Sequence, residues 1–198
     1  MSPVLSIVMP SLSSRAQVSH IAHQIEMQTK DLGDKVEFFE LRDNGVMSTG
    51  KKLQVLYGLC SGEYICGIGD DDVVEDDYVV TLLDGIRHGP VDMITFRHSY
   101  FVNGEWNAEV VMKPGEDEWQ DGDTHYRLPS PLCPVKRDIV LGFDCPDKSD
   151  KEDCAFKDYL RWRAETSYDI PHVLYHHMWS SPDNANERDE LRHRWKRG

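Results

Sequence analysis

The chain has 198 residues, of which 39% are hydrophobic and 29% are charged, a length and composition typical of one globular domain. No stretch approaches the ~20 apolar residues of a membrane span, so we expect no membrane insertion. The formal net charge of −13 argues against a broad nucleic-acid surface, because binding phosphates requires clustered Lys and Arg.

The first half of the chain alternates strand and helix patterns. The apolar run at 4–9 has no basic segment before it, which predicts a first strand, no signal peptide and therefore a cytoplasmic protein. Strands are expected at 4–9, 35–41, 64–68 and 91–97, and amphipathic helices at 18–33, 50–60 and 79–86. This β-α-β-α-β-α-β order predicts an α/β fold with a largely parallel sheet.

The second half of the chain begins with a hairpin signal, since Asn103-Gly104 lies between two β-prone segments. Residues 113–134 lack periodicity and are expected to form a loop. A loop of this length is uncommon in a compact domain unless it binds something or is disordered.

Two further helices are expected after this loop. The first is a short helix at 136–141, and the second follows a capping box formed by Ser149 and Glu152. We expect residues 181–198 to be a polar, basic and mobile tail.

Three consecutive aspartates end the central strand, in the run E-Y-I-C-G-I-G-D-D-D from Glu63 to Asp72. Because side chains alternate along a strand, Asp70 and Asp72 are expected to share a face while Asp71 points elsewhere. Clustered carboxylates repel one another, so the pattern indicates a divalent cation or a hydroxyl-rich ligand at the carboxyl end of this strand. The alternative is a solvated acidic loop that caps the next helix.

Several familiar nucleotide and nucleophile motifs are absent from the sequence. No G-x-G-x-x-G follows the first strand, Gly50-Lys51-Lys52 does not complete a Walker A motif, and no nucleophile elbow is present. What remains is a set of carboxylates and histidines: Asp43, Asp70, Asp72, Glu152, Asp153, His176 and His177.

The order of these motifs resembles a family-2 glycosyltransferase of the GT-A fold. The matching stretches are L-S-I-V-M-P-S, the D-N-G turn at Asp43, G-K-K-L-Q-V-L-Y-G-L-C-S-G-E-Y-I-C-G-I-G-D-D-D, and G-F-D-C-P-D-K-S-D-K-E-D-C-A-F-K-D-Y-L, and together they cover residues 4–178. The resemblance implies a single GT-A type Rossmann-like domain at 1–180. Its nucleotide-sugar-binding half is 1–97 and its acceptor half is 98–180. No Q-x-x-R-W motif is present, which favours a soluble transferase that adds one sugar over a processive synthase.

The resemblance also implies roles for residues in the first half. Asp70 and Asp72 match the D-x-D motif, which binds the ribose and the Mn²⁺ or Mg²⁺ ion that bridges the diphosphate of a sugar nucleotide. Asp43 is implied to recognise the base or ribose, and its alternative is an Asp-Asn-Gly turn without a ligand. Other implied nucleotide-sugar contacts are Pro10, Ser11, Asp71 and either Lys51 or Lys52, although a solvated first-turn lysine is an equal alternative.

In the second half, Glu152 and Asp153 match the family's E-D pair, whose aspartate removes the acceptor proton in inverting members. The alternative is that both acids complement a helix N-terminus. His176 or His177 lies where some GT-A enzymes place a metal ligand. Because neighbours on a strand point to opposite faces, at most one of them is expected to bind metal.

The acceptor is implied to be a hydroxyl of a glycan, a lipid, a protein or a hydroxymethylated DNA base, so nucleic acid is expected only as an acceptor. Aromatic faces suit sugars and bases. Trp119, His125 and Tyr126 are therefore predicted to lie over the cleft and to contact the acceptor.

Two other functions compete with the transferase. One is a metal-dependent phosphohydrolase or nucleotidyltransferase, which would use clustered aspartates around two metals. The other is a non-catalytic module that binds a nucleotide sugar.

Overall fold

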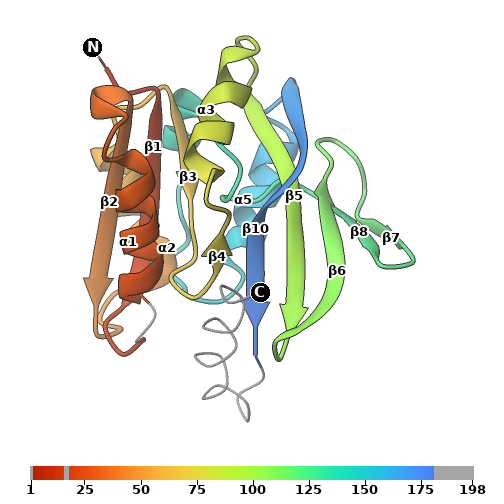
Figure 1. Ribbon diagram of the computed structural model, residues 1–198, viewed down its shortest axis with the longest axis horizontal. Helices are drawn as coiled ribbons and strands as arrows, with labels where there is room; N and C mark the ends of the chain where they lie inside the picture. The colour runs from red at the N-terminus through yellow and green to blue at the C-terminus, as the bar shows by residue number, and fades with distance from the viewer. Residues whose placement is uncertain (1, 16–17, 181–198) are drawn as a thin grey trace.

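Figure 1 shows the computed structural model of the chain, in which residues 2–15 and 18–180 are described. The helices are α1 (Val18–Thr29), α2 (Thr49–Leu59), α3 (Tyr78–Arg87), α4 (Arg137–Leu141) and α5 (Glu152–Arg161), with a 3₁₀ turn at Gly33–Lys35. The strands are β1 (Leu5–Leu12), β2 (Val36–Asp43), β3 (Tyr64–Gly67), β4 (Val73–Val74), β5 (Met93–Val102), β6 (Glu105–Met112), β7 (Trp119–Asp121), β8 (Thr124–Arg127), β9 (Val135–Lys136) and β10 (Ser167–Trp179).

The strands of the described residues form one mixed sheet whose centre is parallel. β1 pairs in parallel with β2 on one side and with β3 on the other. β9 lies antiparallel between β3 and β5, so β5 runs in the same direction as β3. β10 pairs in parallel with β5 over its whole length and also with β4. The predicted largely parallel α/β sheet is therefore confirmed, and the arrowheads of β2, β5 and β10 point to one edge (Figure 1).

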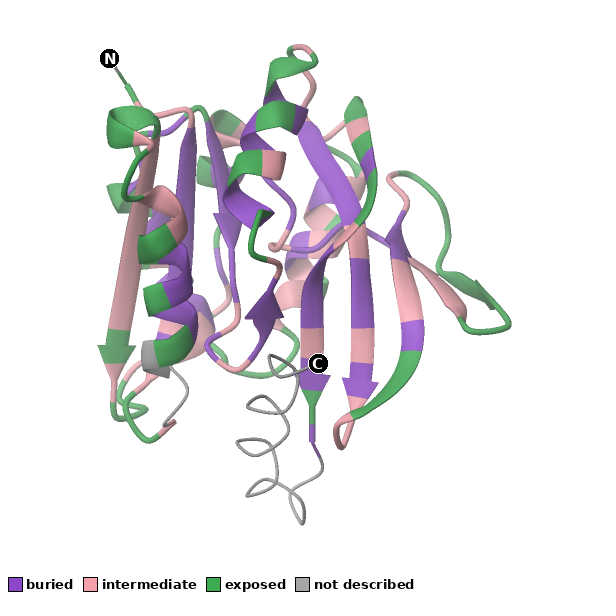
Figure 2. Ribbon diagram, in the orientation of Figure 1, coloured by how far each residue is buried: buried purple, intermediate pink, exposed green. Residues whose placement is uncertain are grey.

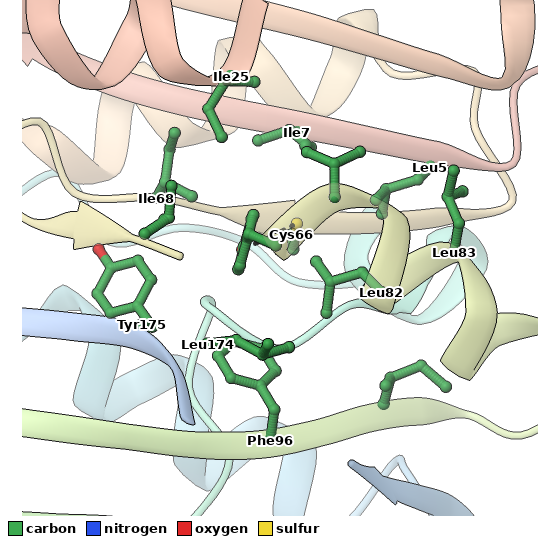
Figure 3. Packing of buried hydrophobic residues seen from close by; sticks show 14 of the residues in the cluster. Leu5, Ile7, Ile25, Cys66, Ile68, Leu82, Leu83, Phe96, Leu174 and Tyr175 are labelled. Carbon is green, nitrogen blue, oxygen red and sulfur yellow. Dashed lines mark hydrogen bonds between the residues drawn. The ribbon is translucent and has the colours of Figure 1, made fainter. Parts of the chain in front are cut away.

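Helices cover both faces of this sheet and enclose two apolar clusters. Side chains from α1 and α3 pack on one face against β1, β3, β5 and β10, and Figure 3 shows them converging. Side chains from α2, α4 and α5 pack on the other face. β1 and β3 are accordingly buried along most of their length, as Figure 2 shows in purple. Burying each large aliphatic side chain stabilises the fold by roughly 1.5–3 kcal/mol.

The predicted hairpin at Asn103-Gly104 joins β5 to β6. Both residues have positive φ, 50° and 83°, as the tight two-residue turn of a hairpin requires. β5 continues to Val102 and does not end at residue 97, so the boundary expected between the two halves falls inside a strand.

The prediction of a loop across 113–134 is wrong in part, because this segment contains the β7–β8 hairpin at the far edge of the sheet. The β7 residues are all exposed, so the short strand leaves no apolar alternation in the sequence. The predicted capping box is also wrong. Lys151 precedes α5 with φ 58° and no side chain caps the helix, while Ser149 Oγ instead accepts a hydrogen bond from Thr49 N at the start of α2.

Residues 181–198, the predicted basic tail, lie outside the described residues. None of the helices formed by residues 2–15 and 18–180 is long and apolar enough to cross a membrane.

Candidate active site

A cavity of about 200 Å³ lies at the edge of the sheet where the parallel strands end. Its wall brings together five residues predicted from the sequence: Pro10, Asp72, Glu152, Asp153 and His177. The remaining wall comes from the start of α2, from the turn after β3 and from residues 130–132.

The starts of α2 and α5 are fastened to one another through the segment that precedes α5. Gly50 N donates to Lys148 O at 3.0 Å, and Thr49 N donates to Ser149 Oγ at 3.0 Å. A Cβ atom on Gly50 would lie 1.9 Å from Pro146 O, so only glycine permits this approach. The glycine of G-K-K therefore acts in packing, and it brings the first turn of α5 to the cavity.

Asp72 is the most tightly held acid of the cavity. Its Oδ2 accepts from Tyr175 Oη at 2.5 Å and lies 3.3 Å from His177 Nδ1, while its Oδ1 accepts from Met178 N at 2.8 Å. Burial alone would raise the pKa of this carboxyl, but the charge of His177 and these hydrogen bonds outweigh burial and lower the pKa to about 2. Tyr175 Oη also accepts from Gly69 N at 2.8 Å. Tyr175 therefore ties the turn of the aspartates to β10.

Asp70 does not share these partners, although the sequence predicted that Asp70 and Asp72 face the same way. β3 ends at Gly67, so the aspartates lie beyond the strand and its alternation does not apply to them. Asp70 Oδ2 accepts from Leu12 N at 2.9 Å, and its Oδ1 pairs with the guanidinium of Arg15, which also lies 3.2 Å from Asp71 Oδ2. The two buried acids thus point to different partners.

Asp43 and Lys52 form a second charged contact near the cavity. Lys52 is 2% exposed, and its Nζ lies 2.6 Å from Asp43 Oδ1 and donates to Ser11 O at 2.5 Å. The hydrogen bond from Lys52, together with those from two backbone N–H groups of the turn, lowers the pKa of Asp43 to about 2. Lys51, by contrast, is exposed in the first turn of α2. Of the two candidate lysines, the structure places Lys52 beside the predicted nucleotide residues.

His176 and His177 point to opposite faces of β10, as expected from adjacent strand positions. His176 Nε2 lies 2.8 Å from Glu75 Oε1, away from the cavity. The ring of His177 stacks on Tyr100, with centroids 5.3 Å apart and planes inclined by 14°. His177 is therefore the histidine that lies with Asp72.

Asp72 and His177 could hold a divalent ion, because carboxylate oxygens and imidazole nitrogens are both metal ligands. In the structure, Asp72 Oδ2 and His177 Nδ1 contact one another directly at 3.3 Å. Within residues 2–15 and 18–180, no group of three or more His, Cys, Asp or Glu side chains is arranged as a metal site.

The two acids of α5 differ in environment. Burial raises the pKa of Glu152, and the negative charges of Asp153 and Asp150 add to this effect. Asp153 is also half-buried, and its Oδ2 lies 3.3 Å from Lys157 Nζ one turn further along the helix. Both side chains line the cavity.

The aromatic residues predicted to contact the acceptor do not line this cavity. Trp119 and Tyr126 stack on one another at 3.8 Å in the β7–β8 hairpin, and His125 lies in the same hairpin. The part of the predicted loop that reaches the cavity is 130–132. A larger cavity of about 460 Å³, between α3 and the start of β10, contains none of the predicted site residues.

Sequence reasoning missed Tyr175 and Arg15. Tyr175 could have been found, because it lies two positions before His177 on a strand and so shares its face. Arg15 has only a weak signal, as a cation in the turn after the first strand.

Comparisons with known proteins identify the fold. No protein-family description and no curated protein matches the chain. Among solved structures, S. aureus TarS 1–349 superposes with a TM-score of 0.58 at 15% identity, over 96% of this chain and 64% of that one. TarS 1–349 in complex with UDP-GlcNAc gives a TM-score of 0.59 at 11% identity, over 91% and 59%.

A longer TarS structure gives a TM-score of 0.60 at 14% identity, over 96% of this chain and 39% of that one. The chain therefore spans between 39% and 64% of the length of these structures. At such identities the likeness establishes the fold, and the predicted GT-A-like α/β fold is confirmed.

Proposed function

We propose that the chain is a glycosyltransferase that moves one sugar from a nucleotide-diphosphate sugar to an acceptor hydroxyl. The observation that carries this proposal is the cavity at the strand ends, where the acids of α5 meet Asp72 and His177. The GT-A-like fold supports it, because open α/β sheets bind ligands at this edge. TarS binds UDP-GlcNAc, so a UDP-sugar is the first donor to test.

We propose that Asp72 and His177 are the residues that would hold Mn²⁺ or Mg²⁺. Such an ion would neutralise charge on a departing diphosphate. Asp70 is a further candidate ligand. His176 is the weaker candidate, because its ring faces Glu75.

The nucleotide is proposed to lie against Pro10, Ser11, Asp43 and Lys52, with Asp71 at the rim. The buried Lys52 fixes Asp43 and the carbonyl of Ser11 relative to one another. A carboxylate held in this way presents a preorganised acceptor to ribose or base N–H and O–H groups, which favours binding because little ordering remains to be done.

Asp153 is proposed as the general base, in a reaction that inverts the anomeric carbon. Its carboxylate takes the proton of the acceptor hydroxyl as the acceptor oxygen bonds to the anomeric carbon and the bond to the diphosphate breaks. The N-terminus of α5 favours a negative charge at this position. Glu152, whose pKa is raised, lies beside it and is proposed to orient the acceptor.

The test is Asp153→Asn, with Asp158→Asn as a matched control on the exposed side of the same helix. Loss of a general base costs ~10²–10⁴ in rate, so kcat should fall by about that factor while the Kd for the donor stays unchanged. The control should keep normal turnover. Proton NMR of the fresh product reports the anomeric configuration, and retention of the donor configuration would exclude the inverting mechanism.

The same assay separates the competing functions. A phosphohydrolase would release phosphate or nucleotide at the same rate without any acceptor, and a binding module would show no turnover before the change. The acceptor class, and the acceptor roles of Trp119, His125 and Tyr126, stay predictions. Since this hairpin lies outside the cavity, an acceptor that touches both would be an extended molecule.

A further inference from the structure

The cavity of the proposed active site has an uneven set of charges. Its wall holds three carboxyl groups, those of Asp72, Glu152 and Asp153, and one histidine, His177. No lysine or arginine among residues 2–15 and 18–180 belongs to this wall. A ligand in the cavity therefore meets several negative groups and little positive charge.

In the proposed reaction, the transferred sugar occupies this cavity. The diphosphate departs on the side of Asp72, and the base of an inverting reaction stands on the opposite face of the anomeric carbon. Asp72 and Asp153 line the same cavity, so the sugar ring of the donor lies between them. The volume of about 200 Å³ suits a single ring, since pockets for drug-sized ligands measure roughly 300–1,000 Å³.

Glu152 stands in the negative part of the wall. Burial raises the pKa of its carboxyl, and the charges of Asp153 and Asp150 raise it further, while Lys148 offsets them in part. The cation beside Asp153 is Lys157, whose Nζ lies 3.3 Å from Asp153 Oδ2. Because Lys157 is not part of the wall, it balances Asp153 and leaves the charge of Glu152 next to the ligand.

Most other side chains of the wall are apolar. They are those of Pro10, Leu53, Ile68, Pro131 and Leu132. Such a surface suits the C–H groups of a sugar ring, and carboxylates accept hydrogen bonds from its hydroxyl groups. A carboxylate on the sugar would have no cation to pair with, and burying an unpaired charge is costly.

We propose that the cavity selects an uncharged donor sugar over a uronic acid, in which carbon 6 is a carboxylate, and that Glu152 determines this specificity. The inference rests on the proposed transferase function. A uronic acid would bring its carboxylate next to Glu152 and Asp153, and like charges brought together at a binding site repel. His177 does not relieve this repulsion, because its Nδ1 lies 3.3 Å from Asp72 Oδ2.

The test compares donors that differ only at carbon 6, by isothermal titration calorimetry with the full chain in a buffer containing Mn²⁺. UDP-glucose and UDP-glucuronate form one pair, and GDP-mannose and GDP-mannuronate form a second pair for a site that prefers guanine. The uncharged member of a pair should bind about tenfold more tightly than the anionic member. Glu152→Gln should reduce this ratio to about threefold, because it removes one of the two repelling charges.

Asp158→Asn is the matched control. It removes the same charge from an exposed position of the same helix, outside the wall of the cavity. The affinity ratio of this variant should stay within about twofold of that of the unmodified chain, because an exposed charge is screened by solvent. Glu152→Ala replaces Glu152→Gln if the latter does not fold.

The outcomes separate this inference from the proposed function. Equal affinity for the two members of a pair, or tighter binding of the uronic acid, would overturn the selection and leave the transferase standing. A tenfold preference that persists in both Glu152 variants would overturn the role of Glu152. Absence of binding by all the donors would overturn this inference together with the proposed donor site.

Discussion

Removal of one hydroxyl, by Tyr175→Phe, should loosen the turn that carries the aspartates. The ring would remain packed against Tyr78 and His98, because only Oη is lost. Asp72 would lose its 2.5 Å donor and Gly69 N its 2.8 Å acceptor. A hydrogen bond to a charged group contributes roughly 1.5–3 kcal/mol and a neutral one roughly 0.5–1.5 kcal/mol, so about 3 kcal/mol of stability should be lost.

A loss of this size should lower Tm by about 6–12 °C in a domain of this length. Urea unfolding followed by circular dichroism measures the change in the free energy of unfolding. Tyr78→Phe is the matched control, since Tyr78 is equally buried and its hydroxyl has one hydrogen-bond partner among the described residues, the thiol of Cys66 at 3.9 Å. The control should lose less than about 1 kcal/mol. If both variants lose the same stability, Tyr175 is not the tie that the structure indicates.

Three further changes test the packing and charges around the site. Gly50→Ala should lower the free energy of unfolding by about 1–3 kcal/mol, because the new Cβ would overlap Pro146 O. Gly58→Ala in the same helix, with open space at its Cβ, should raise the free energy of unfolding by about 0.5–1 kcal/mol. Similar effects of the two variants in urea unfolding would contradict the close approach of Gly50 to Pro146. Hydrogen bonds from a lysine, a hydroxyl and two backbone N–H groups outweigh burial and lower the pKa of Asp92 to about 2. The folded state therefore favours the charged form, so Asp92→Asn should lower the free energy of unfolding by about 1 kcal/mol at pH 7. The difference between the two proteins should shrink as pH falls from 4 to 2, where Asp92 becomes protonated. A difference that does not change with pH would refute the stabilising role of the Asp92 charge. Lys52→Met should lower the free energy of unfolding by about 1–3 kcal/mol and weaken UDP binding, because Lys52 is buried. Lys51→Met, at an exposed position, should change the free energy of unfolding by less than about 0.5 kcal/mol. Equal UDP affinity in the two variants would show that Lys52 is not part of the nucleotide site.

The central α/β unit could be predicted because its pattern is local. The apolar run of β3 and the helical spacing in α1, α2 and α3 are visible within ten or so residues, and the structure has all four elements. The resemblance to a known family named Asp72 and one of His176 and His177 as metal ligands, and it left the choice between the two histidines open. The resemblance to a known family placed Glu152 and Asp153 at the same cavity, although periodicity alone would have left them as a helix start.

What the sequence could not indicate depends on contacts between distant segments. The partner of Asp70 is a cation 55 residues away, and no spacing rule links Arg15 to the aspartates. Ser149 has the residue type of a helix cap, but it bonds to another helix 100 residues away. The β7–β8 hairpin is short and exposed, so it forms through strand pairing at the sheet edge without an amphipathic signal.

The last strand, β10, has a consequence for how the chain folds during synthesis. The hydrogen-bond partners of Asp72 are synthesised long after it: Tyr175, His177 and Met178 follow it by 103, 105 and 106 residues. Closing loops of this length costs conformational entropy before any contact compensates, so these pairings should form late. A ribosome that has released only the first hundred residues has made β1, β3 and the helices between them, yet the acids of the D-D-D turn still repel one another. Until β10 is synthesised, Arg15 can offset that repulsion, because it precedes the aspartates in the chain and pairs with two of them in the folded protein.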